Sequence, residues 1–131
     1  MAKAIHSMVR VLEEDRSVNF YRTAFGLEIS DRLDATDFSL IYLSNPETDF
    51  EFELTVNKGR TEPYDVGDGY GHLAVSVADL DEEFARLKAE GLNPGKLIEF
   101  APNGTTFARF FFITDPDGYK IEVLERSGRF K

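Results

Sequence analysis

The sequence predicts an α+β fold of two βαβββ modules, because three of its features occur twice. Residues 5–11 and 71–77 both have the pattern of a short strand, and in each a His is followed by Val three and five residues later. A stretch with helical spacing follows each of these strands and ends at a glycine, Gly26 or Gly91. Three more strand patterns then complete each half. The length of 131 residues suits one domain of ordinary size.

The first half opens with alternation that places His6, Met8 and Arg10 on one face of a strand. The helix that follows is expected to start at Asp15 or Ser17, since both residue types favour the N-cap. Its apolar stripe consists of Val18, Tyr21 and Phe25. Strands are expected next over residues 27–33, 38–43 and 50–56.

The second half repeats this order with clearer helix signals. Asp79 is a candidate N-cap, and Glu82 stands three residues later as in a capping box. The apolar stripe of this helix consists of Leu80, Phe84 and Leu87. Strands are expected over residues 96–100, 106–113 and 119–124, with a turn at 115–118. The predicted modules are residues 1–57 and 71–131, joined by a glycine-containing linker at 58–70.

Composition and charge exclude several classes of function. Asp and Glu number 24 against 15 for Lys and Arg, and the formal net charge is −9. A nucleic-acid binder needs a basic face, and this chain has no basic cluster. Adhesion to an anionic membrane is disfavoured for the same lack of positive charge. The absence of Cys removes disulfides, thiolate metal sites and Cys nucleophiles. No apolar membrane span or signal core is found, so a cytoplasmic location is expected.

Four polar residues stand at equivalent places in the two halves. His6 and His72, the only histidines, lie in the opening strands, and Glu53 and Glu122 lie in the last strands. Two imidazoles and two carboxylates, brought together by a pseudo-two-fold axis, suit a divalent transition metal. Taken singly, each could instead be a hydrogen-bonded His or a solvent-facing Glu. Glu51 shares a face with Glu53 and is expected to be an exposed rim carboxylate, with a supporting role or competition for the ligand position as alternatives.

Longer segments around these residues resemble the glyoxalase I (lactoylglutathione lyase) family of the vicinal oxygen chelate superfamily, in its short bacterial form. The resemblance covers nearly the whole chain. It is carried by four segments: His6-Ser7-Met8-Val9-Arg10-Val11, Glu53-Leu54-Thr55-Val56-Asn57, Tyr70-Gly71-His72-Leu73-Ala74-Val75-Ser76-Val77 and Asp115-Pro116-Asp117-Gly118-Tyr119-Lys120-Ile121-Glu122. It implies half-barrel sheets completed in a homodimer, with active sites between subunits.

The resemblance also implies a site and a reaction. The metal ligands would be His6, Glu53, His72 and Glu122, with Ni(II) favoured and Co(II) or Zn(II) as alternatives. The reaction would convert the hemithioacetal of methylglyoxal and glutathione to S-lactoylglutathione through an enediolate. Glu122 is the expected catalytic base and Glu53 its symmetric catalytic counterpart. Arg10 and Asn57 match positions that bind the glutathione moiety.

Departures from the family pattern concern the thiol cosubstrate. Lys58 replaces a large residue, and the loop at 101–104 lacks the Lys that meets an anionic end of glutathione. Arg109 is a candidate replacement cation. The alternative functions are a related enzyme acting on another hydroxycarbonyl or CoA-type substrate, such as an epimerase, and a metal-free small-molecule binding module. Extradiol dioxygenases and fosfomycin-modifying enzymes use two His and one Glu, so a fourth ligand argues against them.

Overall fold

The computed structural model describes residues 1–131 and divides them into two compact units, Met1–Asp65 and Val66–Lys131. We call them the first and second modules. The division falls inside the predicted linker. The first module contains β1 (His6–Arg10), α1 (Glu14–Phe25), β2 (Glu28–Asp34), β3 (Phe38–Ser44) and β4 (Glu51–Asn57). The second contains β5 (Leu73–Val77), α2 (Leu80–Ala89), β6 (Ile98–Phe100), β7 (Ala108–Thr114) and β8 (Lys120–Glu125).

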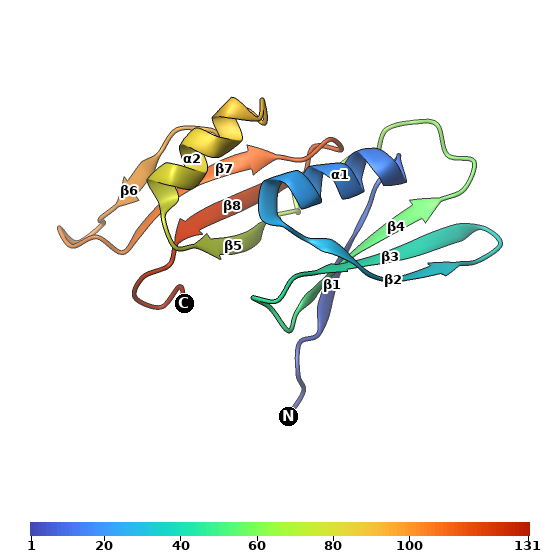
Figure 1. Cartoon of the computed structure of the whole chain (residues 1–131), viewed down its shortest axis with the longest axis horizontal. Coiled ribbons are helices and arrows are strands. Elements are labelled where there is room, and N and C mark those ends of the chain that lie inside the picture. Colours follow the sequence, from blue (N-terminus) through green and yellow to red (C-terminus); the bar gives the residue numbers. More distant parts are fainter. The chain divides into compact units, whose positions relative to one another are not determined.

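Each module is one four-stranded mixed sheet with a helix across one face (Figure 1). The strand orders are β1-β4-β3-β2 and β5-β8-β7-β6, so the two modules share one topology. The first and last strands of each module are parallel neighbours, and the other pairs are antiparallel. The predicted α+β fold of two βαβββ modules is therefore confirmed.

The core of each module lies between the helix and its sheet. In the first module Tyr21 of α1 packs on Phe52 of β4, with ring centroids 4.9 Å apart. In the second, Phe84 of α2 packs on Phe111 of β7 at 5.4 Å. Because strand side chains alternate, the residues on either side of Phe52 point to the other face of the sheet. We call that second face, turned away from the helix, the open face of the module.

The helix boundaries match the sequence at three of their four ends. Asp79 caps α2 by accepting a hydrogen bond from the backbone N–H of Glu82 at 2.9 Å. Gly26 and Gly91 follow the helices with positive φ angles of 64° and 76°. The expected start of α1 at Asp15 or Ser17 was wrong, because the helix begins at Glu14. The carbonyl of Glu13 already accepts the first helical hydrogen bond, from the N–H of Ser17, so neither expected residue is at the cap.

Replacing Gly26 with Ala is expected to lower the free energy of unfolding by about 1–2 kcal/mol, because a side chain disfavours the left-handed conformation. Space is not the cause, since no atom lies within 4 Å of the point that a Cβ would occupy at this position. Gly69→Ala is the matched control, because Gly69 also has no atom within 4 Å and lacks a positive φ. Urea unfolding of both variants measures the effect. Equal stability of the two variants would contradict the role given to the backbone angle.

No helix in the structure combines the length and apolar character needed to cross a membrane.

Candidate metal and active site

His6 and Glu53 meet on the open face of the first module. His6 begins β1, and Glu53 lies in the middle of β4. The parallel register pairs His6 with Glu51, which places Glu53 one step further along the same face. The His6 Nε2 and Glu53 Oε2 atoms are 3.1 Å apart. The sequence-predicted pair of this module is thus brought together by the pairing of its first and last strands.

His72 and Glu122 form the corresponding pair in the second module. Their Nε2 and Oε2 atoms are 3.6 Å apart. His72 directly precedes β5 instead of opening it, and Ala74 pairs with Glu122. The hydroxyl of Tyr70 anchors the approach to His72 by donating to the carbonyl of Lys120 at 3.2 Å.

The turn before β8 fixes the start of the strand that carries Glu122. The buried Asp115 accepts hydrogen bonds from the backbone N–H groups of Asp117 and Tyr119, both at 2.9 Å. Gly118 adopts a φ of 97°, which favours glycine. The Asp-Pro-Asp-Gly turn therefore leads directly into the strand that carries Glu122.

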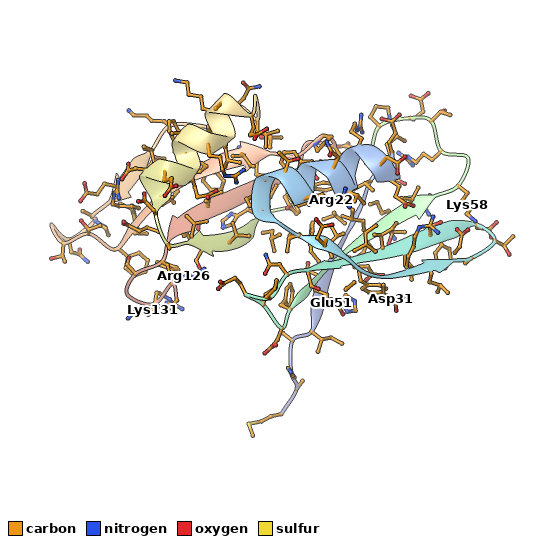
Figure 2. All side chains as sticks on the ribbon, viewed as in Figure 1. Arg22, Asp31, Glu51, Lys58, Arg126 and Lys131 are labelled. Atoms are coloured by element: carbon orange, nitrogen blue, oxygen red, sulfur yellow. The ribbon has the colours of Figure 1, made fainter.

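Glu51 belongs to the same open face but does not contact His6 through its carboxylate. Its Oε2 accepts a hydrogen bond from the hydroxyl of Ser30 in β2. Figure 2 shows Glu51 and Asp31 on the side of the sheet away from α1. Glu53 rather than Glu51 pairs with the imidazole, so Glu53 is the better placed of the two as a ligand.

Tyr42 is a site residue that the sequence analysis missed. It lies directly opposite Glu53 in the β3–β4 register. Burial and the neighbouring Glu53 carboxylate raise the pKa of the Tyr42 hydroxyl above its ordinary value. The two-residue alternation of the expected strand could have placed Tyr42 on the open face, because Ile41 and Leu43 on either side of it are apolar.

Arg10 and Asn57, the predicted substrate-binding residues, lie in the same sheet as the first pair. Arg10 ends β1 and is exposed on the side of His6, because two-residue periodicity relates the two. Asn57 ends β4, and its Oδ1 accepts a hydrogen bond from the hydroxyl of Tyr64 at 2.7 Å. The structure therefore places both residues on elements that also carry His6 and Glu53.

Arg109 does not point toward the candidate site, so the suggestion that it replaces a missing lysine was wrong. Its guanidinium pairs with Asp81 of α2 at 3.2 Å and with Glu125 of β8 at 3.1 Å. Both partners raise the pKa of the Arg109 guanidinium. The side chain thus covers the helix-bearing face of its sheet, opposite Glu122.

The donor atoms in each pair suit a divalent metal. Two ligands bound at about 2.1 Å to one ion lie about 3.0 Å apart at a right angle and about 3.4 Å apart at a tetrahedral angle. The observed separations of 3.1 and 3.6 Å are close to these values. Imidazole nitrogen and carboxylate oxygen are also donors that Ni, Co and Zn accept. No group of three or more His, Cys, Asp or Glu side chains able to hold a metal is present.

Comparison with known proteins agrees with this architecture. The family model described as the glyoxalase/bleomycin resistance protein/dioxygenase superfamily matches residues 3–123. The chain belongs to this superfamily. The relatives of this superfamily member include the lactoylglutathione lyase of Neisseria meningitidis serogroup A, 38% identical over 95% of this chain and 91% of the relative. The lactoylglutathione lyase of Salmonella typhimurium is 35% identical over 94% of this chain and 92% of the relative.

Solved structures of the same superfamily are also similar. Glyoxalase I of Leishmania major, described as trypanothione-dependent, has a TM-score of 0.77 and 31% identity, covering 95% of this chain and 87% of its own. Glyoxalase I of Zea mays has a TM-score of 0.78 and 29% identity, covering 96% of this chain and 45% of its own. The fold and family predicted from the sequence are both confirmed.

Proposed function

We propose that this superfamily member is a lactoylglutathione lyase, which converts the hemithioacetal of methylglyoxal and glutathione to S-lactoylglutathione. The observation that carries the proposal is the pair of His–Glu contacts, His6 with Glu53 and His72 with Glu122, at equivalent places in two modules. Relatives named lactoylglutathione lyase, at 35–38% identity over most of the chain, support it. The same relatives support the classification of the chain as an enzyme.

The reaction moves one hydrogen between adjacent carbons. We assign Glu122 as the base that removes a proton from the carbon bonded to sulfur and the hydroxyl group, giving the enediolate. The protonated Glu122 then returns this proton to the neighbouring carbon. The hydroxyl proton on the first carbon passes to the oxygen of the neighbouring carbon, so that the thioester carbonyl forms at the first carbon and a hydroxyl at the second. A bound divalent metal would act as a Lewis acid that stabilises negative charge on the two adjacent oxygens. His6, Glu53, His72 and, until it loosens to act as the base, Glu122 would hold that metal.

We further propose that the complete site forms in a homodimer. One module offers only two of the four predicted donors, so a metal bound by all four needs the His6–Glu53 pair and the His72–Glu122 pair. In the proposed homodimer these two pairs come from different subunits. The open face of the first module also carries exposed large apolar side chains, among them Met8, Leu33 and Phe38. Such surfaces are typical of protein interfaces. Ni(II) is the proposed metal because the chain resembles the short bacterial form, and a cytoplasmic location is part of the same proposal.

Arg10 and Asn57 are proposed to bind the thiol part of the substrate. A guanidinium pairs well with a carboxylate, and an amide can both donate and accept hydrogen bonds. Glutathione is the proposed thiol. The acidic Glu51 on the same face makes the identity of the thiol a question for measurement, and the trypanothione-dependent relative supplies the second thiol to test.

The deciding experiment loads metal-free protein with Ni(II) and supplies methylglyoxal with glutathione or with trypanothione. Thioester formation with glutathione is expected only after metal loading, with Co(II) and Zn(II) loading as comparisons. Bound metal without turnover of either hemithioacetal would redirect the search to another hydroxycarbonyl or CoA-type substrate. Failure to bind or respond to any of the three metals would favour a metal-free binding module.

A further inference from the structure

The two candidate carboxylates face different neighbours on the adjacent strand. In the first module, Tyr42 of β3 is the direct register partner of Glu53. Directly opposed residues on one face of an antiparallel pair have Cβ atoms about 4.5–5.5 Å apart, so their side chains interact. This pairing places the phenol of Tyr42 beside the Glu53 carboxylate, and burial together with that carboxylate raises the pKa of the hydroxyl. Its ring also meets the His6 ring edge to face, with centroids 6.0 Å apart.

The second module has a phenylalanine at the same place. Phe112 of β7 is the direct register partner of Glu122. Its ring meets the His72 ring at 5.4 Å and 75°, much as Tyr42 meets His6. Phe112 has no hydroxyl to offer the carboxylate of Glu122. The two half-sites therefore share ring packing and differ in one donor.

The two glutamates also differ in the exposure of their side chains and in their distance from the paired imidazole. The side chain of Glu53 is 8% exposed and lies 3.1 Å from its imidazole, whereas that of Glu122 is 16% exposed and lies 3.6 Å away. A carboxylate that binds a metal is commonly held in place by a further hydrogen bond, which fixes its orientation. Tyr42 can offer Glu53 such a hydrogen bond from the adjacent strand, whereas Phe112 can offer Glu122 none.

We propose that Tyr42 is a positioning residue that keeps Glu53 in place as a permanent metal ligand, whereas Phe112 leaves Glu122 free to loosen and act as the base. This inference rests on the proposed function and extends it, because it explains why two symmetric glutamates have different roles. Tyr42 acts through Glu53 and does not itself exchange a proton with substrate.

The test exchanges the two residues, since Tyr42→Phe gives the first module the environment of the second, and Phe112→Tyr does the reverse. The affinity of metal-free protein for Ni(II) alone is measured by competition with a chelator. Tyr42→Phe is expected to weaken Ni(II) binding about 10-fold, within the range seen when a group supporting a ligand is lost. Phe112→Tyr is expected to leave Ni(II) binding equal or tighter and to lower kcat about 10-fold at unchanged KM, because the new hydroxyl restrains Glu122.

The outcomes separate this inference from the proposed function. If Tyr42→Phe binds Ni(II) within about twofold of the unsubstituted protein, the role given to Tyr42 is overturned. If Phe112→Tyr keeps full kcat, the role given to Phe112 is overturned. Absence of binding of Ni(II), Co(II) and Zn(II) alike by the unsubstituted protein would instead overturn the proposed function. Tyr42→His, which keeps a donor, provides a second variant, and recovery of Ni(II) affinity relative to Tyr42→Phe supports the positioning role.

Discussion

Replacing Glu122 with Gln is expected to lower kcat by about 10²–10⁴-fold while the protein stays folded, because general-base catalysis contributes rate factors of this size. Gln keeps the shape of Glu and an oxygen that can bind a metal, but it cannot accept a proton at neutral pH. Glu122 is only partly buried and contacts one imidazole, so the substitution leaves the core of the second module intact. Steady-state kinetics after metal loading, together with size-exclusion chromatography, measures activity and assembly.

Glu125→Gln is the matched control for this experiment. Glu125 lies in the same strand, β8, but pairs with Arg109 on the helix-bearing face. Activity of the Glu125→Gln protein is expected to stay within about twofold of the original, because surface substitutions away from the site have small effects. Full activity of the Glu122→Gln protein would refute the assignment of Glu122 as the base.

Replacing Glu53 with Gln is expected to weaken Ni(II) binding by about 100-fold or more. Loss of a group that only supports a metal ligand already lowers metal affinity by about 10–100-fold, and this substitution removes the charge of the ligand itself. The His6–Glu53 separation of 3.1 Å places this carboxylate, and no other in its module, against the imidazole. Chelator competition on the metal-free protein measures the change without any need for turnover.

Glu51→Gln distinguishes the two glutamates that share the open face. Glu51 is hydrogen-bonded by Ser30 and does not pair with His6, so Ni(II) affinity is expected to change less than about threefold. A large loss in Glu51→Gln combined with a small loss in Glu53→Gln would transfer the ligand role to Glu51. The two substituted positions are one strand repeat apart and undergo the same change in charge, which makes the comparison direct.

Periodicity and turn chemistry were sufficient to predict the module architecture. The Gly stops at Gly26 and Gly91, the Asp79 cap and the alternation in most strands all act over a few residues, so the sequence alone reveals them. The start of α1 was misplaced because its cap, Glu13, makes no side-chain hydrogen bond and so leaves no residue-type signature.

The internal repeat was sufficient to predict the four His and Glu residues of the candidate site, but not the residues that contact them, such as Tyr42. His6 and Glu53 could be matched with His72 and Glu122 from equivalent positions alone. The choice between Glu51 and Glu53 depends on the strand register, which places His6 diagonally from Glu53. The face of Arg109 could not be predicted because the apolar run at 110–113 hides the alternation of β7.

The parallel pairing of first and last strands has a consequence for how the protein folds. His6 and Glu53 are 47 residues apart in the chain, so they meet only when the module has closed from end to end. Such distant pairing is slow, because a long loop must be ordered before its contacts form. A metal held by both residues would bind only the closed module, and free metal at 100 times its Kd would add about 2.7 kcal/mol to the free energy of unfolding. The metal would then bind late in folding and hold the first and last strands of the module together. Without the metal, the edge strand β1 would be the first part of the module to exchange its amide hydrogens.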